Sequence, residues 1–411
     1  MKEKTLKVCD FVIYWSIVIM PFSVAIAPGV ANTFIGLFSA FFVIKKIIEK
    51  KPLGVDKAVL VPFIFLFVIS LFSFVNSVSF SASFNGIIKL LKYFLIFAVC
   101  CQEIRDKEHI GRIVFSICCG ISLMAIDAIW QIFSGYDFVH GNALQSCIID
   151  LARPTASFPN PNVFGVYMTA LAPLAIGLTI FYFKGGKRAL MFLTSLLAIS
   201  GVYLTLSRGA GLAIYASILF LSVSGKKKFL TFALVAIIII FPFVMPKHIK
   251  QWAKEINYNP LVFMCNQDRI SIYSNTVNMI KHHPFLGVGI NTFSRNYGKY
   301  KTESAEKYAH TPDTIYSHNI YLQMAGETGL LGLFSFLWFL FVVFKQAMRS
   351  FRKLDDPYLK AAAISLVACI IGFLVNGLTE TSLYYARVSM VFWYLIGVSL
   401  ALGRLSVSHE K

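Results

Sequence analysis

The sequence predicts an all-α polytopic membrane protein with about twelve transmembrane helices and one large structured outer loop. Of its 411 residues, 57% are hydrophobic and 14% are charged, whereas soluble domains carry about 25% charged residues. Long apolar runs recur about a dozen times, and each is close to the roughly 20 residues that a helix needs to cross a bilayer. A water-soluble globular protein is therefore excluded.

The apolar runs give the expected elements in chain order. We expect membrane-spanning helices at residues 11–27, 29–48, 58–75, 84–101, 111–133, 162–183, 189–206, 209–223, 229–245, 329–345, 359–377 and 387–403. These helices divide the chain into three parts. Residues 1–245 hold helices one to nine, residues 246–328 form the large outer loop, and residues 329–411 hold the last three helices and a short tail.

The basic residues predict the orientation of these helices. The net charge is +18, which in a soluble chain would suggest a nucleic-acid partner. Here the lysines and arginines gather in alternate connections, for example at residues 226–228 and 345–360. The short connections on the other side hold only three of them: Arg153, Arg208 and Arg387. By the positive-inside rule we expect both termini in the cytoplasm, with membrane lipids and no nucleic acid as partners.

The large outer loop carries signals of its own local structure. Asp268 can cap a helix with an apolar face, and a second helical stretch is expected at 291–307. Cys147 and Cys265 fall in outer segments, where one disulfide or two free thiols both fit the sequence. We therefore expect a folded loop rather than a flexible connection.

Cofactor motifs are absent from the sequence. It contains no G-x-x-x-x-G-K-[ST] phosphate loop, and no pair of histidines has zinc spacing with a third ligand. We expect no cofactor and no metal. A polytopic transporter is the alternative from a different class, but it should place ionisable residues in the middle of several helices, and Asp127 is the main such residue.

Two arginines are candidates for binding phosphate. Arg208 lies between two apolar stretches, at the start of a helix whose dipole disfavours a cation, and Arg269 stands in the first turn of the loop helix beside Asp268. A guanidinium group offers a planar fork that matches phosphate oxygens. The alternatives are a headgroup anchor for Arg208 and a solvated ion pair with Asp268 for Arg269.

Other ionisable residues stand at the outer ends of the helices. Lys89 and Lys92 are three residues apart and so share one helical face, from which they can neutralise a lipid phosphate or reach the headgroups. Glu380 and Arg387 border the last outer connection. A local ion pair between Glu380 and Arg387 is the default expectation.

His318 is the candidate general base. If a polar residue at 313–317 caps the following helix, His318 lies in the first turn, where the helix dipole and nearby arginines favour the neutral imidazole. A neutral imidazole can accept a proton. The alternative is a histidine with a purely structural role.

The sequence that begins at this histidine resembles that of a known protein family. Residues 318–332 fit the pattern H-[NSQ]-x9-G-x-x-G, which resembles the bacterial O-antigen ligases, a family of membrane glycosyltransferases. The resemblance extends to three more segments: SFPNPNVFG at 157–165, TLSRGAG at 205–211, and Arg269 followed by HPFLGVGINTF at 283–293. It covers about residues 155–335, whereas the first five helices match only in hydropathy and number.

The resemblance implies a fold, a reaction and site residues. Members look like twelve-helix enzymes of the bacterial inner membrane whose active site lies beneath a large periplasmic loop. The implied donor is a glycan linked to undecaprenyl diphosphate, and the implied acceptor is a sugar hydroxyl of lipid A core or a related glycolipid. The resemblance implies that Arg208 and Arg269 bind the donor diphosphate and that His318 is the essential base. It also implies a transfer that inverts the configuration at the anomeric carbon and requires no metal. We further expect substrate-binding roles for six residues: Lys89, Lys92, Asn160, Asn162, Asn319 and Glu380.

Two related families are close alternatives. O-antigen polymerases are associated with an arginine-x10-glycine pattern, but glycine is absent eleven residues after each outer arginine that could begin it. The residues found after Arg153, Arg269 and Arg295 are Phe164, Ile280 and Glu306. Protein O-oligosaccharyltransferases tend to carry an extra domain after the last helix, where only about eight residues follow here. The sequence therefore favours a ligase.

Overall fold

The computed structural model describes residues 2–146, 152–244, 266–307 and 309–408, and in addition residues 250, 251, 254 and 259. Cys147 and Cys265 lie outside the described residues. The first half of the chain forms α1 (Lys2–Ile26), α2 (Pro28–Glu49), α3 (Lys57–Phe72), η1 (Ser73–Asn76), α4 (Phe80–Glu103), α5 (Lys107–Ser134), α6 (Pro161–Phe181), α7 (Gly185–Leu204), α8 (Arg208–Ser224) and α9 (Lys228–Val244). Between α5 and α6, β1 (Gln145–Ser146) pairs antiparallel with β2 (Ala152–Arg153).

The second half begins with short helices and ends with three long ones. They are α12 (Gln267–His282), α13 (Phe293–Asn296), η2 (Tyr297–Tyr300), α14 (Glu303–Glu306), α15 (Ile320–Lys353), α16 (Pro357–Asn376), η3 (Ser382–Tyr384) and α17 (Ala386–Ser408). The predicted all-α class is confirmed, because the two short strands are the only sheet among the described residues.

The described part of the chain contains ten helices that are long and apolar enough to cross a membrane. Two further apolar helices, α8 and α9, are shorter, with 17 residues each. All twelve predicted segments are thus helical and follow one another as expected. The chain is a multi-pass membrane protein, and the count of twelve crossings remains a prediction.

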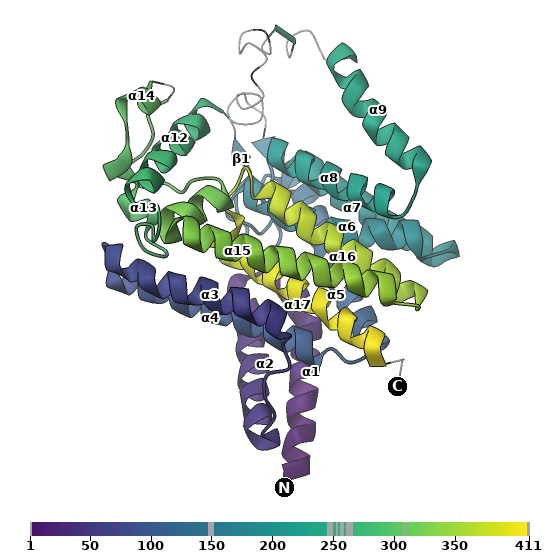
Figure 1. Cartoon of the computed structure of the whole chain (residues 1–411). Coiled ribbons are helices and arrows are strands. Elements are labelled where there is room, and N and C mark those ends of the chain that lie inside the picture. The colour runs from purple at the N-terminus through teal and green to yellow at the C-terminus, as the bar shows by residue number, and fades with distance from the viewer. Residues whose placement is uncertain are drawn as a thin grey trace.

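The depth of each helix in the bundle follows from its composition. The central helices α6, α17 and α16 are apolar around their whole circumference, and 94%, 89% and 78% of their apolar windows are buried. In α2 and α7 the corresponding share is 28%, so these helices lie at the periphery. Figure 1 shows α15, α16 and α17 running side by side, with α12, α13 and α14 gathered beyond the N-terminal end of α15.

A break inside α15 separates its first nine residues from the long span. Gly329 has φ +70° and ψ −177°, and a Cβ atom there would lie 2.1 Å from the carbonyl oxygen of Phe285. Only glycine fits this close approach. The N–H of Leu330 donates to Pro284 (2.7 Å) and the N–H of Val288 donates to the carbonyl of Gly326 (2.9 Å). Residues 284–289 are therefore hydrogen-bonded to the residues of α15 on both sides of Gly329.

The loop helices form a small core of their own. Ile272, Met279, Val288, Phe293 and Tyr297 pack together and are almost fully buried. The predicted helical stretch over 291–307 is helical in most of its residues but is divided among α13, η2 and α14. Phe293 and Tyr297 are four residues apart and pack together against Ile272 and Met279 of α12.

Candidate functional site

Glu380 lies in the short connection between α16 and α17. The chain turns immediately after α16, where the N–H of Thr379 donates to the carbonyl of Asn376 (2.9 Å). Glu380 is only 3% exposed, and its Oε1 accepts a hydrogen bond from the N–H of Thr381 (3.2 Å). A buried carboxylate requires further polar partners, and two distant parts of the chain supply them.

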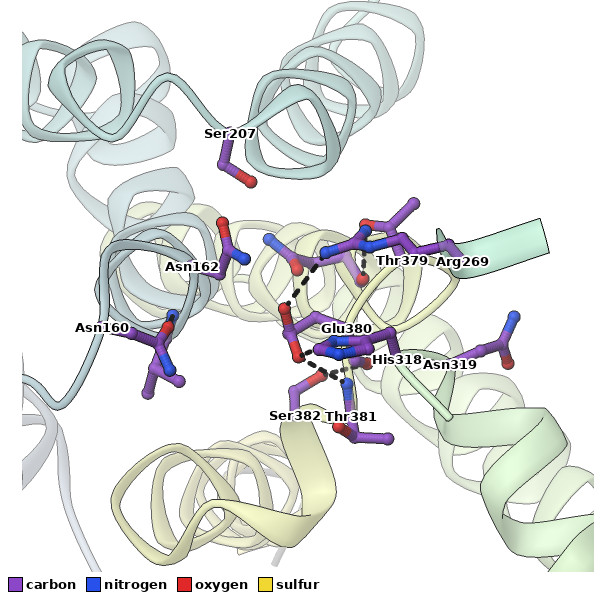
Figure 2. Close-up of polar contacts among 12 residues, drawn as sticks. Asn160, Asn162, Ser207, Arg269, His318, Asn319, Thr379, Glu380, Thr381 and Ser382 are labelled. Atoms are coloured by element: carbon purple, nitrogen blue, oxygen red, sulfur yellow. Dashed lines mark hydrogen bonds and ion pairs between the residues drawn. The ribbon is translucent and has the colours of Figure 1, made fainter. Parts of the chain in front are cut away.

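His318 supplies the first partner. Its Nδ1 is hydrogen-bonded to Glu380 Oε1 at 3.1 Å, as Figure 2 shows. The backbone of His318 is left-handed, with φ +50°, and the hydroxyl of Tyr273 donates to its carbonyl oxygen (3.1 Å). Asn319, rather than a residue at 313–317, caps α15 by accepting from two N–H groups of the first turn. The prediction that His318 lies inside that turn is therefore wrong, because it precedes the capping residue.

Arg269 supplies the second partner. It stands in the first turn of α12, where Asn266 accepts from the N–H of Arg269 (3.3 Å) and Asp268 accepts from the side chain of Asn266 (2.9 Å). The guanidinium of Arg269 reaches Glu380 Oε2 at 3.5 Å. The pairing of Arg269 with its neighbour Asp268, offered as an alternative from the sequence, is thus replaced by a contact between segments 111 residues apart.

The protonation of Glu380 follows from these contacts. Burial alone would raise the pKa of the Glu380 carboxyl, but the hydrogen bond from His318 and the positive charge of Arg269 outweigh burial and lower it. Glu380 is therefore a carboxylate near neutral pH. A carboxylate can only accept, so it holds the proton of a neutral His318 on Nδ1 and leaves Nε2 as the ring nitrogen with a lone pair.

The N-terminus of α8 approaches the same connection. Arg208 is the first residue of α8, and Ser207 caps the helix by accepting from the N–H of Ala210 (3.4 Å). A Cβ atom on Gly209 would lie 1.9 Å from the side-chain oxygen of Thr379, so α8 begins directly against the residue before Glu380. The start of α8, with the exposed Arg208 as its first residue and the positive end of the helix dipole, thus lies beside the connection that carries Glu380.

The N-terminus of α6 approaches from the opposite side. Figure 2 shows Asn162 and Ser207 facing Arg269 and Glu380. Asn162 accepts from the guanidinium of Arg153 (2.9 Å), whose Nε donates to the carbonyl of Thr205 (2.6 Å). The segment 157–165 is in this way fixed to the segment 205–211.

Asn160 and Asn319 have the same local role in two different helices. Asn160 caps α6 by accepting from the N–H of Val163 (2.9 Å), as Asn319 caps α15. Asn319 also donates from its side chain to the carbonyl of Leu378 (3.0 Å), which ties the start of α15 to the connection that carries Glu380. Both asparagines therefore position the backbone around the cluster.

Arg387 does not pair with Glu380, and the expectation of a local ion pair is wrong. Its guanidinium is buried and donates to the carbonyl oxygens of Val24, Ala25 and Ser157. It also lies over the ring of Phe158, 3.9 Å from the ring centroid. Arg387 thus fixes segment 157–165 to the end of α1, while Glu380 turns the other way toward His318.

Lys89 and Lys92 bond to residues other than the His318–Glu380 pair. Lys89 Nζ donates to the side chain of Asn291 (3.1 Å), and Lys92 Nζ lies 3.5 Å from the side-chain oxygen of Asn32. The two lysines share a helical face as expected, and Lys89 contacts the segment 283–293 that follows α12.

Glu327 is a buried acidic residue that sequence reasoning missed. It is 1% exposed and accepts from the N–H of Asn291 (2.7 Å), the side chain of Gln323 (3.0 Å) and the hydroxyl of Tyr384 (3.0 Å). Glu327 therefore connects segment 283–293, α15 and the connection after α16. Its position in the sequence could have indicated this role. Glu327 lies in an apolar stretch before Gly329, and an acidic side chain there needs hydrogen-bond donors from the protein.

Ligands of the kind that bind metals are sparse in this region. Among the described residues, no group of three or more His, Cys, Asp and Glu side chains is placed to hold a metal ion. The cluster contributes His318 and Glu380, which bond to each other. Arg269 contacts Glu380 directly, Arg153 bonds to Asn162, and α8 begins with Arg208 beside the connection that carries Glu380.

One comparison with known proteins covers part of this region. Residues 193–337 match the family model described as O-antigen ligase, and the match contains Arg208, Arg269 and His318 but ends before Glu380. No curated protein is significantly similar to the chain. Residues 193–337 of this multi-pass membrane protein are therefore similar to the O-antigen ligase family, whose members are glycosyltransferase-like membrane enzymes of lipopolysaccharide synthesis.

Proposed function

We propose that the protein is an O-antigen ligase of the bacterial inner membrane. It transfers a glycan from undecaprenyl diphosphate to a sugar hydroxyl of lipid A core on the periplasmic side. The observation that carries this proposal is the hydrogen bond of 3.1 Å from His318 Nδ1 to the buried Glu380, beside Arg269 and the start of α8. These groups match the needs of glycosyl transfer to a hydroxyl.

His318 is the proposed general base. A sugar hydroxyl is a weak nucleophile and reacts faster when a base within hydrogen-bond reach removes its proton. His318 Nε2 takes that proton as the hydroxyl oxygen attacks the anomeric carbon of the donor. The ring then becomes an imidazolium, and the Glu380 carboxylate on Nδ1 stabilises its charge, as an aspartate does in a hydrolase triad. Glu380 is therefore a positioning residue that acts through His318.

Arg208 and Arg269 are the proposed ligands of the donor diphosphate. The bond from the anomeric carbon to the phosphate oxygen breaks as the new bond forms on the opposite face, so the configuration inverts and undecaprenyl diphosphate leaves. The leaving diphosphate gains negative charge, which fixed guanidinium groups stabilise without a metal. The N-terminal end of α8 adds its dipole to the same place, as helix N-termini commonly do for phosphate. Arg269 is within 3.5 Å of Glu380, so a bound diphosphate competes with that contact.

The remaining predicted substrate contacts are assigned by their positions. We assign Lys89 and Lys92 to the phosphates of a lipid substrate, since both stand on one face of α4 and Lys89 contacts segment 283–293. Asn162 and Asn319 border the His318 cluster and are assigned to glycan hydroxyls, together with Asn160 at the start of α6.

The decisive experiment is transfer with purified components. The full-length protein is supplied with a defined undecaprenyl-diphosphate glycan and lipid A core, with and without EDTA. A ligase forms the glycan–core product and releases undecaprenyl diphosphate in equal amounts. Elongation of one donor glycan by another, with no transfer to lipid A core, would instead identify a polymerase. Transfer to a protein acceptor alone would identify an oligosaccharyltransferase, and activity lost in EDTA and restored by magnesium would overturn the metal-free mechanism.

The proposed orientation has a separate test. Reporter fusions after residues 225 and 300 should lie in the cytoplasm and the periplasm, respectively, because basic residues gather in alternate connections. The same compartment for both fusions would contradict the twelve-helix arrangement with both termini in the cytoplasm.

A further inference from the structure

A second polar cavity lies at the end of α15 that is remote from His318. It has a volume of about 490 Å³ and is enclosed by the start of α3 and the C-terminal ends of α4, α15 and α17. Its lining includes Arg349, Lys353 and Arg404. In Figure 1 the C-terminal ends of α15 and α17 lie at the end of the bundle away from α12.

Hydrogen bonds and close packing fix the walls of this cavity. Gln346 on α15 donates to Asp56 at the start of α3 (2.7 Å), and Arg404 on α17 donates to the carbonyl of Cys101 on α4 (2.8 Å). A Cβ atom on Gly403 would lie 2.4 Å from the side-chain oxygen of Ser350, so α17 and α15 touch here. The four helix ends therefore form one joined structure rather than separate tips.

The charge inside this cavity is unbalanced. Asp56 is the one carboxylate among the described lining residues, and it is already engaged: Oδ1 accepts from the N–H of Ala58 (2.8 Å) and Oδ2 from Gln346. Within the described part of the chain, Arg349 and Lys353 form no ion pair. The two side chains are four residues apart, so they project from the same face of α15.

We propose that this cavity binds the phosphate-containing headgroup of an anionic membrane lipid. The cations belong to the last turns of helices that are long enough to cross a membrane, so they stand at the depth of the headgroups. Basic pockets between transmembrane helices are the usual form of sites for acidic phospholipids. The volume is sufficient for a phosphate with its glycerol. The bound phosphate would contact residues of α3, α15 and α17 at once and so connect the three helices. The inference does not depend on the proposed glycosyl transfer.

The test compares two double variants of the delipidated full-length protein in detergent. Arg349→Gln/Lys353→Gln removes two charges from the cavity, and Lys345→Gln/Arg352→Gln removes two from the same helix outside the lining. Binding of phosphatidylglycerol and of zwitterionic phosphatidylethanolamine is measured by native mass spectrometry. We expect the cavity variant to bind phosphatidylglycerol about 30-fold more weakly than wild type, and the control variant to stay within about threefold.

Three outcomes overturn the proposal. They are an equal loss in the control variant, equal affinity of wild type for the two lipids, and displacement of phosphatidylglycerol by the same concentration of glycerol 3-phosphate or inorganic phosphate. The last outcome would identify a site for a soluble phosphate instead of a lipid. If circular dichroism shows that the double variant is misfolded, the single variants Arg349→Gln and Lys353→Gln replace it, each with an expected loss of about fivefold.

Discussion

Two groups of charges in the molecule are built very differently. At the C-terminal end of α4, Lys45 contacts Asp10 and Glu103 at 2.6 Å each, and Arg105 contacts the same two carboxylates at 2.9 Å each. Two cations and two anions thus form a closed group, and the side chains of Lys45 and Glu103 are 3% and 6% exposed. Every charge in this group has a partner of opposite sign at short distance.

The cluster around Glu380 is open by comparison. One carboxylate serves His318 at 3.1 Å and Arg269 at 3.5 Å, and α8 begins with Arg208 beside the connection that carries it. These contacts are longer than those of the closed group. A closed group contributes to stability, whereas the long contact between Arg269 and Glu380 can be exchanged for a contact between Arg269 and an anion from outside. The comparison therefore predicts that changes in one region alter activity and changes in the other alter folding.

The largest effect on activity is expected at His318. His318→Ala should lower the transfer rate by 10²- to 10⁴-fold, because general-base catalysis typically contributes that much. His318→Gln should be similarly slow, since an amide can accept a hydrogen bond but cannot take up the proton. Both variants should keep the donor affinity of wild type, measured in detergent. His318→Ala should also lower the melting temperature, because it removes a polar partner of the buried Glu380. His282→Gln, at an exposed histidine on α12, is the control. Full activity in His318→Gln would remove the base assignment.

The largest effect on folding is expected at Lys45. Lys45→Met leaves two carboxylates with Arg105 alone, and breaking a buried pair typically costs about 3 to 5 kcal/mol. The free energy of unfolding should fall by about that amount, while the activity of each folded molecule is retained. Lys7→Met serves as the control, because the Lys7–Glu3 pair is exposed and worth under about 1 kcal/mol. A loss of transfer rate in Lys45→Met at equal folded concentration would contradict the division between the two regions.

The arginines should show an intermediate effect on activity. Arg208→Lys and Arg269→Lys keep the charge but lose the planar fork, and one charge-assisted hydrogen bond is worth about 1.5 to 3 kcal/mol. Transfer should therefore fall at least about tenfold in each variant. Arg188→Lys, on the exposed side of α7, is the matched substitution that should change nothing. Normal transfer in both site variants would show that neither arginine is a specific phosphate ligand.

The smallest effect is expected in the pH dependence of stability. The pKa of Glu380 is lower in the folded protein than in the unfolded chain, so its charge stabilises the fold above the unfolded value of about 4.3. That contribution is lost as the pH falls through the folded pKa. Glu380→Gln should therefore be less stable than wild type at pH 7, and the difference should shrink below about pH 4. Melting curves between pH 3 and 7 test this, with the exposed Glu303→Gln as control. A difference that is constant over this range would contradict the role of the carboxylate charge.

The sequence was sufficient for the positions of the helices and for segments that meet near Glu380. Apolar runs set the positions of the helices, and the pattern around His318, with segment 205–211 and the segment around Arg269, pointed to parts of the chain that the structure brings to one region. It was not sufficient for the pairing of charges. Glu380 is seven residues from Arg387 and 62 from His318, so proximity in the chain favoured the wrong partner. Which side chain Glu380 meets depends on how the connection turns after α16.

The residue at which a helix begins was also not predictable from the sequence. Several polar residues at 313–317 could each have capped α15, and nothing local distinguishes them from Asn319. The choice depends on tertiary bonds, because the N–H of Ile320 donates to the carbonyl of Gly377 (2.8 Å) and Asn319 bonds to Leu378. The same bonds hold His318 in its left-handed conformation. If α15 began one or two residues earlier, His318 would lie in the helix instead of in the turn before it.

The late position of Glu380 in the chain has a consequence for biogenesis. Membrane proteins are inserted as they are synthesised, so the segment with Arg208 leaves the ribosome 172 residues before the segment with Glu380. At about 5 to 20 residues per second, this interval lasts roughly 10 to 30 s. During that time a nascent chain can present its guanidinium groups to lipid phosphates, but the carboxylate that orients His318 has not yet been made. The complete arrangement therefore first exists when the connection between the last two helices is inserted, and assembly of the bundle and completion of the cluster become a single event.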